Sequence, residues 1–279
     1  VEQLSLDLKD AFPGVKGFST TNIWYAKKWY LFYNEYVIKL HQPGGEIPMP
    51  KEFGAVPWRH HVEIITKCQS VEEAVFYVNK VVEEGWSRRR LEDELATNLY
   101  VRHGKAITNF STSLTLPQST LATEMLKDPY TFDFLTLTQG YNEKQLEEAL
   151  AHNITRFLLE LGSGFAYVGR QMELRMPNGQ SYFPDMVFYH IKMRCYVVVE
   201  LKVVEFMPEF AGKLNFYVSA ADHLLRSADD NPTIGLLICR SKDETIVQWS
   251  LEEINRPIGV ASYQLQEVVD ETLKMKLEN

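Results

Sequence analysis

The sequence lacks several features that would each indicate a particular class of protein. Its 279 residues include only three cysteines, Cys68, Cys195 and Cys239, and none of them stands in a C-x-x-C spacing. This odd, widely spaced set argues against a disulfide framework and against a zinc site, so we expect free thiols in a reducing, cytoplasmic compartment. No apolar run approaches the roughly 20 residues that a membrane-spanning helix needs, so we expect no membrane partner.

The chain also lacks the excess of basic residues that is typical of nucleic-acid-binding proteins. Its formal net charge is −8 at pH 7. Residues 1–110 contain 14 Lys and Arg against 14 Asp and Glu, whereas residues 111–279 contain 15 against 23. Net charge bears on solubility and on the steering of ligands rather than on fold. The acidic balance therefore lowers the expectation of a phosphate-bearing partner without removing it.

The first part of the chain is typical of short helices joined by tight turns. Ser19, Ser70 and Ser87 each precede a segment of helical periodicity, and each is a predicted N-cap. The last of these helices opens with S-R-R-R, which suits a helix-turn-helix-like module. We predict a helical domain over residues 1–110, followed by a polar linker over residues 111–120.

The pattern changes in the second part, residues 121–279. A long amphipathic helix ends at Gly162, and it is followed by strand-like runs at Phe165–Met176, Tyr182–His190 and Cys195–Val204. The first of these runs allows a break near Arg170. A helix over Pro208–Arg226 then precedes two further predicted strands, at residues 233–241 and 245–251. The turn signal Asn178-Gly179 and a short link near residue 192 predict three antiparallel strands, and the later strand–helix–strand step predicts a parallel crossover. The expected fold is α+β or α/β, with a mixed sheet flanked by helices.

Charged residues interrupt the most apolar of these strands. Glu200 and Lys202 lie two residues apart, so they share one face of the strand, and Asp185 follows Pro184 in the preceding run. A tight turn between the two runs lets Asp185 and Glu200 lie side by side. These charges either emerge at a strand end and carry no chemistry, or they converge on one site.

Convergence would create a recognisable kind of site. Two neighbouring carboxylates remain ionised together only when a cation lies between them. Carboxylate oxygens suit Mg²⁺ or Mn²⁺, which would place the metal on Asp185 and Glu200. A lysine beside such an ion, here Lys202, can hold an attacking water or stabilise developing negative charge. The pattern therefore favours metal-assisted phosphodiester hydrolysis.

These residues also resemble a known family. The spacing P-D, 14 residues and then E-L-K, within an αβββαβ order, resembles the PD-(D/E)XK nuclease superfamily. Segments along the whole chain, among them GFSTTNI, GWSRRRLE, LKDPYTFDFL and CYVVVELK, resemble its bacterial YhcG-like branch. The resemblance implies an N-terminal helical, winged-helix-like DNA-binding domain and a C-terminal restriction-endonuclease-like domain over residues 121–279.

The resemblance also implies roles for single residues. Asp185 and Glu200 match the metal-binding acids of the superfamily, and Lys202 matches its catalytic lysine. Many members add a Q-x-x-x-Y motif on the next helix, where this chain has Lys213 and Tyr217 as K-x-x-x-Y. Lysine can contact a phosphate but cannot accept a hydrogen bond, so Lys213 cannot reproduce the acceptor role of glutamine.

A glutamate on the first helix of the nuclease domain is a further frequent feature of the superfamily. Glu147 and Glu160 are the two candidates. Glu147 falls within the apolar stripe of its helix, whereas Glu160 lies off its edge. An acid on a buried stripe needs a compensating partner, which favours Glu147, although Glu160 is nearer the strands in sequence.

Basic side chains in the first domain are candidates for DNA contacts. Arg88, Arg89 and Arg90 start one helix, and Lys27 and Lys28 are adjacent in another. The arginines are followed by acids at the i, i+4 spacing of ordinary helix ion pairs, so a solvated helix face explains them equally well.

The sequence thus predicts a Mg²⁺- or Mn²⁺-dependent endonuclease that acts on DNA. RNA stays open as a substrate, and so does assembly into a homo-oligomer. The alternative is a non-catalytic DNA-binding or assembly protein that retains the nuclease fold.

Overall fold

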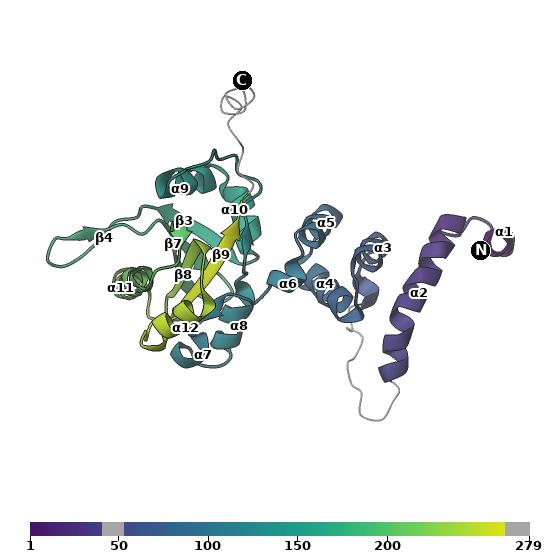
Figure 1. The fold of residues 1–279 in the computed structure, drawn as a ribbon. Coiled ribbons are helices and arrows are strands. Elements are labelled where there is room, and N and C mark those ends of the chain that lie inside the picture. Colours follow the sequence, from purple (N-terminus) through teal and green to yellow (C-terminus); the bar gives the residue numbers. More distant parts are fainter. Residues whose placement is uncertain (41–52, 266–279) are drawn as a thin grey trace, which may run out of the picture. The chain divides into compact units, whose positions relative to one another are not determined.

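The chain folds into two compact units, which Figure 1 shows as ribbons. The computed structural model describes residues 1–40 and 53–265. Residues 266–279, the end of the predicted nuclease domain, lie outside this range. The first unit is Val1–Tyr100 and the second is Val101–Asn279.

The first unit is helical throughout its described residues. Its elements are α1 (Glu2–Ala11), α2 (Thr20–Leu40), a 3₁₀ turn η1 (Phe53–Ala55), α3 (Trp58–Lys67), α4 (Val71–Glu84), α5 (Arg88–Ala96) and the start of α6 (Leu99–Arg102). Ser19, Ser70 and Ser87 each accept a hydrogen bond from a backbone N–H of the first helical turn, which confirms the predicted N-caps. The described part of this unit contains no strand, so the wing implied by the resemblance is not among its described residues.

Apolar residues from α2 to α5 close the core of this unit. The largest buried members include Tyr33, Ile64, Tyr77 and Leu91, each at most 1% exposed. They recur at helical spacing along their helices, so one face of each helix turns inward.

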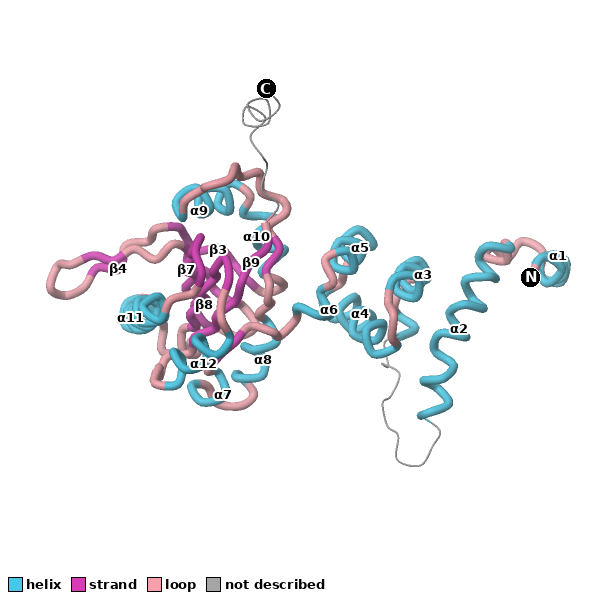
Figure 2. Tube along the Cα trace, in the orientation of Figure 1, coloured by secondary structure: helices cyan, strands magenta, loops and turns pink. Residues whose placement is uncertain are grey.

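The second unit is built on a mixed sheet of seven strands, drawn in magenta in Figure 2. Its elements are β1 (Ile107–Thr108), α7 (Phe110–Ser113), α8 (Gln118–Met125), β2 (Tyr130–Thr131), α9 (Glu143–His152), α10 (Ile154–Leu161), β3 (Phe165–Arg170), β4 (Leu174–Arg175), β5 (Ser181–Tyr182), β6 (Met186–His190), β7 (Cys195–Glu205), α11 (Pro208–Leu224), β8 (Ile234–Ser241), α12 (Glu244–Glu252) and β9 (Ile258–Gln264). The strand order is β1-β9-β8-β7-β6-β3, and β2 pairs with β9.

The pairing directions follow the predicted topology. β3, β6 and β7 are antiparallel neighbours, whereas β7, β8 and β9 run parallel to one another. The step from β7 through α11 to β8 is therefore the predicted parallel crossover. β4 and β5 form a separate two-stranded hairpin around Asn178-Gly179, which projects away from the sheet in Figure 2.

Helices cover both faces of this sheet. Val197, Val199 and Leu201 of β7 share a core with residues of α9 and α10, whereas Val198 shares another with residues of α11 and α12. Because successive side chains of a strand point to opposite faces, β7 must be apolar on both. This double burial explains why its sequence is an almost unbroken apolar run.

The predicted linker belongs to the second unit instead of separating the two units. Residues 111–120 contain most of α7 and the start of α8. Phe110 and Ala122, which flank them, are fully buried in the core of the second unit. Along the sequence, the first compact unit ends at Tyr100 and the second begins at Val101, ahead of the predicted domain end at residue 110.

Two secondary-structure predictions for the second unit are wrong. Residues 245–251 were expected as a strand but lie in α12, because the Asp243 side chain caps the N–H of Ile246 at 3.0 Å and Val247 and Leu251 bury one helix face. The final strand is β9 instead. The long helix expected to end at Gly162 is divided at Asn153 into α9 and α10.

The described cysteines agree with the expectation of free thiols. Cys68, Cys195 and Cys239 are all free and buried. Over residues 1–40 and 53–265, no helix has the length and apolar character needed to cross a membrane.

Candidate active site

Asp185, Glu200 and Lys202 meet on two inner strands of the sheet, where β6 begins beside the middle of β7. The antiparallel register pairs Met186 with Val199, so Asp185 stands next to Glu200. The backbone N–H of Leu201 donates to Asp185 Oδ2 at 2.8 Å, and the N–H of Asp185 lies 3.4 Å from Glu200 Oε1. The two carboxylates are therefore neighbours on adjacent strands.

Glu200 is a buried acid on a central strand, with a side chain that is only 1% exposed. The pKa of Glu200 is raised to about 7. Burial is the largest cause, and the neighbouring Asp185 carboxylate is the second. Burial also raises the pKa of Asp185, although the hydrogen bond from Leu201 opposes it. Both acids are held in a setting that disfavours negative charge unless a cation is near.

Two ammonium groups supply positive charge to Glu200. Lys213 Nζ of α11 lies 2.9 Å from Glu200 Oε2, and Lys202 Nζ lies 3.8 Å from the same oxygen. Lys202 is itself buried, and its ammonium also donates to Glu143 Oε2 at 2.8 Å and to the Leu201 carbonyl at 3.0 Å. The ion pairs offset part of the cost of burying these charges.

The two candidates for the accessory glutamate, Glu147 and Glu160, have different surroundings in the structure. Glu147 of α9 is buried, and its Oε2 accepts a hydrogen bond at 2.7 Å from the side-chain amide of Gln171. The same amide lies 3.4 Å from Asp185 Oδ1. Arg170 Nε lies 3.2 Å from Glu147 Oε1, and burial raises the pKa of Glu147. Glu147 is thus connected to the acid pair through one side chain.

Glu160 of α10 belongs to a different cluster of charged residues, away from the acid pair. Its Oε1 accepts hydrogen bonds from Arg102 Nη1 at 2.6 Å and from the N–H of Thr131 at 2.8 Å. Its Oε2 lies 3.5 Å from Lys127 Nζ. Since Arg102 and Lys127 are buried as well, this group compensates buried charge inside the fold.

Sequence reasoning missed two residues that the structure adds to the site. Glu143 precedes Glu147 by one helical turn, so both acids lie on the same face of α9, and Glu143 pairs with Lys202. Gln171 follows β3 with a φ of 47°, a left-handed conformation that is uncommon for a residue other than glycine. The i, i+4 pair of glutamates was visible in the sequence, whereas nothing local marked Gln171.

The accessory positions Lys213 and Tyr217 lie one turn apart on α11. Lys213 Nζ is 5.1 Å from the centroid of the Tyr217 ring, besides its contact with Glu200. The side chain at the position of the superfamily's glutamine therefore contacts one of the two acids directly.

These residues fit a small divalent cation. Mg²⁺ is usually bound through one or two carboxylates and several waters, and Asp185 and Glu200 provide such a pair of hard oxygen ligands. Two neighbouring carboxylates with raised pKa values, buried Glu200 and partly buried Asp185, would be stabilised by added positive charge. Over residues 1–40 and 53–265, no three His, Cys, Asp or Glu residues form a cluster able to hold a metal ion. The acid pair is thus suited to a hydrated ion with few protein ligands.

The basic residues of the first unit have partners of their own. Arg88 contacts Glu63 and Glu92, each at 2.8 Å, and Arg90 forms an ion pair with Glu94. The i, i+4 pairs of the solvated-face interpretation are therefore present. Arg89 and Lys27 are exposed, while Lys28 Nζ lies 5.9 Å from the Trp24 ring centroid.

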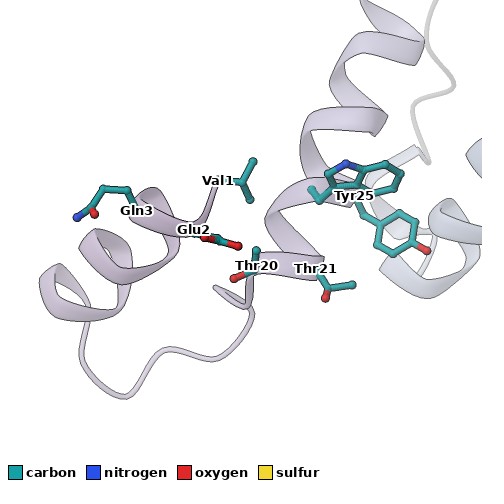
Figure 3. A pocket seen from close by; sticks show the side chains of 7 residues that line it. Val1, Glu2, Gln3, Thr20, Thr21 and Tyr25 are labelled. Carbon is teal, nitrogen blue, oxygen red and sulfur yellow. The ribbon is translucent and has the colours of Figure 1, made fainter.

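A cavity of about 640 Å³ lies in the first unit between α1 and the start of α2 (Figure 3). It is lined by Val1, Glu2, Gln3, Thr20, Thr21, Trp24 and Tyr25. The lining contains a single carboxylate and none of the predicted catalytic residues. The acids and lysines around Glu200 of β7 are therefore the stronger candidate for an active site.

Comparisons with known families cover almost the whole chain. The family model of the YhcG PDDEXK nuclease domain matches residues 123–278, and that of the DUF1016 N-terminal domain matches residues 1–102. A protein of Escherichia coli (strain K12) named "Putative nuclease YhcG" is 29% identical over 293 residues, which cover 95% of this chain and 76% of that protein.

Two solved structures show weaker likenesses. A complex of EndoMS with double-stranded DNA is 18% identical at a TM-score of 0.32, over 49% of this chain and 48% of that chain. A repair endonuclease from Pyrococcus abyssi is 17% identical at a TM-score of 0.30, over 47% of this chain and 50% of that chain. The chain spans about half the length of each, and TM-scores this low establish no common fold.

The raised pKa of Glu200 predicts a pH-dependent stability. Its ordinary value is 4.5 and its value in the folded chain is about 7, so between these values the folded chain retains a proton that the unfolded chain has lost. The free energy of unfolding should then fall as pH rises through this window, by at most about 1.4 kcal/mol per pH unit for one proton. Glu200→Gln removes this titration, so its stability relative to the wild type should increase from about pH 5 to about pH 7 and then level off.

Urea unfolding of both proteins in EDTA, at several pH values, measures this difference. Glu148→Gln, on the same helix as Glu147, is the matched control, because it removes one carboxylate outside the acid pair. A constant difference between wild type and Glu200→Gln over this pH range would contradict the raised pKa.

Proposed function

Because the chain belongs to the YhcG family of PDDEXK nucleases, we propose that it is a divalent-metal-dependent endonuclease that hydrolyses phosphodiester bonds in DNA. The observation that carries this proposal is the convergence of Asp185, Glu200 and Lys202 where β6 begins beside the middle of β7. A protein that kept only the fold would have no need to bury Glu200 and Lys202 beside the partly buried Asp185, given what the desolvation of charges costs.

The two acids would hold Mg²⁺ or Mn²⁺. When bound, such an ion lowers the pKa of its water and neutralises charge on a phosphate. Lys202 would hold the attacking water and stabilise the negative charge that develops on the scissile phosphate. Its contacts with Glu143 and with the Leu201 carbonyl fix the ammonium in position before the substrate binds.

Glu147 is the accessory glutamate that we assign to this site. Its hydrogen bond to Gln171, and the contact of Gln171 with Asp185, orient the first metal-binding acid. Glu160 has a structural role in this proposal, because its carboxylate pairs with Arg102 and Lys127.

Duplex DNA is the substrate class that we propose. The first unit, winged-helix-like by its resemblance, would bind the DNA, and Lys27, Lys28 and Arg89 are its proposed phosphate contacts. Arg88 and Arg90 would contribute less, since glutamates already neutralise them. The three free, buried cysteines agree with activity in the reducing cytoplasm.

The decisive variant is Lys202→Ala. We expect it to lower the rate of DNA cleavage by roughly a hundredfold or more, because one preorganised electrostatic group is lost at the reacting phosphate. Divalent-metal binding should persist, because no metal ligand is removed. Asp185→Ala should instead lose metal binding, with partial rescue at raised Mn²⁺.

The measurements are cleavage of plasmid DNA, single-stranded DNA and RNA with Mg²⁺, Mn²⁺ or EDTA, together with metal titrations by calorimetry. Cleavage of RNA alone would change the substrate class. If Lys202→Ala cleaves DNA at the original rate, the activity does not come from this site, and the non-catalytic DNA-binding or assembly alternative takes its place.

Glu147→Gln and Glu160→Gln should fail in different ways. The first should lower the cleavage rate with little change in the free energy of unfolding, because it weakens the orientation of Asp185. The second should lower the free energy of unfolding by about 3 kcal/mol or more, because buried cations lose a charged partner. Its cleavage rate per folded molecule should stay near that of the wild type. Cleavage rates and urea unfolding are measured for both variants. A lower cleavage rate in Glu160→Gln with an unchanged rate in Glu147→Gln would make Glu160 the accessory acid.

Salt dependence tests the proposed DNA contacts in the first unit. In the full chain, replacing Lys27 and Lys28 together by alanine should weaken binding to duplex DNA and reduce the slope of log affinity against log salt by about two. Arg88→Ala is the matched control, since its charge is already paired with two glutamates. Fluorescence anisotropy with labelled duplex in EDTA gives both slopes, and an unchanged slope in the double variant would remove these lysines from the DNA interface.

A further inference from the structure

Lys213 and the buried acid Glu200 form an unusual pair. Lys213 Nζ lies 2.9 Å from Glu200 Oε2, and this oxygen is also 3.8 Å from Lys202 Nζ. The Glu200 side chain is 1% exposed, whereas the Lys213 side chain is 46% exposed. One ammonium therefore reaches a buried carboxylate from a position that is half in solvent.

We propose that Lys213 is a displaceable cation of the site, which competes with the divalent metal for the Glu200 carboxylate. In the metal-free chain its ammonium partly neutralises Glu200, and metal binding between Asp185 and Glu200 requires it to withdraw. This inference rests on the proposed metal-dependent function and adds a residue that controls metal affinity.

The geometry favours Lys213 over Lys202 as the group that withdraws. Lys202 is buried and keeps Glu143 and the Leu201 carbonyl as partners, at 2.8 and 3.0 Å. Lys213 extends from α11 with its ammonium nitrogen 5.1 Å from the centroid of the Tyr217 ring, and its side chain is 46% exposed. Long, partly exposed lysine side chains change rotamer at low cost, so Lys213 can retreat towards water without disturbing the core.

The charges explain why this competition affects affinity. A cation that binds the two carboxylates while Lys213 remains in contact with Glu200 would meet a like charge only a few ångströms away, and like charges at this range repel. The ammonium must therefore either stay and weaken metal binding or lose its own contact with Glu200. A neutral glutamine at this position, as in the Q-x-x-x-Y motif, removes that repulsion.

The test is Mn²⁺ titration by calorimetry of the full chain at about pH 8, after treatment with chelator. Wild type is compared with Lys213→Gln, with Lys213→Arg, which keeps the charge, and with Lys192→Gln. Lys192 is exposed in the turn between β6 and β7, at the end of these strands opposite to the acid pair. We expect Lys213→Gln to lower the dissociation constant for Mn²⁺ about tenfold, as removal of a close like charge typically does, and the two other variants to stay near the wild type.

Thermal unfolding provides a readout that does not depend on activity. In EDTA, Lys213→Gln should unfold at a lower temperature than Lys192→Gln, because Glu200 loses a counter-charge, and saturating Mn²⁺ should remove that difference. Equal stability of the two variants in EDTA would show that Lys213 does not neutralise Glu200 and would overturn the inference.

The titration separates this inference from the proposed function. The competition is supported if Lys213→Gln binds Mn²⁺ more tightly than the wild type, or if Lys213→Gln binds Mn²⁺ and the wild type does not. Equal or weaker binding by Lys213→Gln overturns it, while binding by the wild type leaves the proposed metal-dependent function intact. Absence of Mn²⁺ binding in every variant overturns both.

Discussion

The burial of a glutamate in the middle of a sheet is the constraint on which the rest of the site depends. Glu200 stands on β7, between β6 and β8, so its carboxylate cannot turn away to the surface. An uncompensated charge in such a place costs several kcal/mol. The neighbouring ammonium groups of Lys202 and Lys213 offset this cost, and the backbone N–H of Asp185 faces the second carboxylate oxygen. The same electrostatic demand suits the site to a divalent ion.

Packing of α9 on the sheet supplies the remaining polar groups. Leu146 and Leu150 bury one stripe of this helix in the core beside β7. Glu143 and Glu147, one turn apart, are thereby directed at opposite ends of the site: Glu143 contacts Lys202, and Glu147 reaches Asp185 through Gln171. The hydrophobic packing that holds α9 on the sheet thus also orients two carboxylates of the site.

The contrast between Glu147 and Glu160 shows that burial of an acid does not by itself indicate function. Both are largely buried and both stand on helices that cover the same face of the sheet. Glu160 is paired with two buried cations, Arg102 and Lys127, so its own charge is compensated within the fold. Glu147 is held by a neutral amide and a partly exposed arginine, and its pKa is raised. The difference lies in the partners, and raised pKa values with incomplete charge compensation are typical of functional sites.

The sequence by itself determined the features that depend on short-range patterns. Serine caps located three helices, alternation along β7 placed Glu200 and Lys202 on one face, and a tight turn paired β6 with β7 and so brought Asp185 beside Glu200. Local patterns failed at residues 245–251, where an apolar, β-branched run is a helix because of a cap and of packing on the sheet.

Only the tertiary structure decided which distant side chains complete the site. The contact of Lys202 with Glu143 joins residues 59 positions apart, and that of Gln171 with Glu147 joins residues 24 positions apart. Periodicity and capping report on neighbours within a turn or a hairpin, whereas these contacts depend on how a helix packs across the sheet. For the same reason the sequence showed that Lys213 replaces a glutamine, but only the packing of α11 against β7 showed that its ammonium contacts the Glu200 carboxylate.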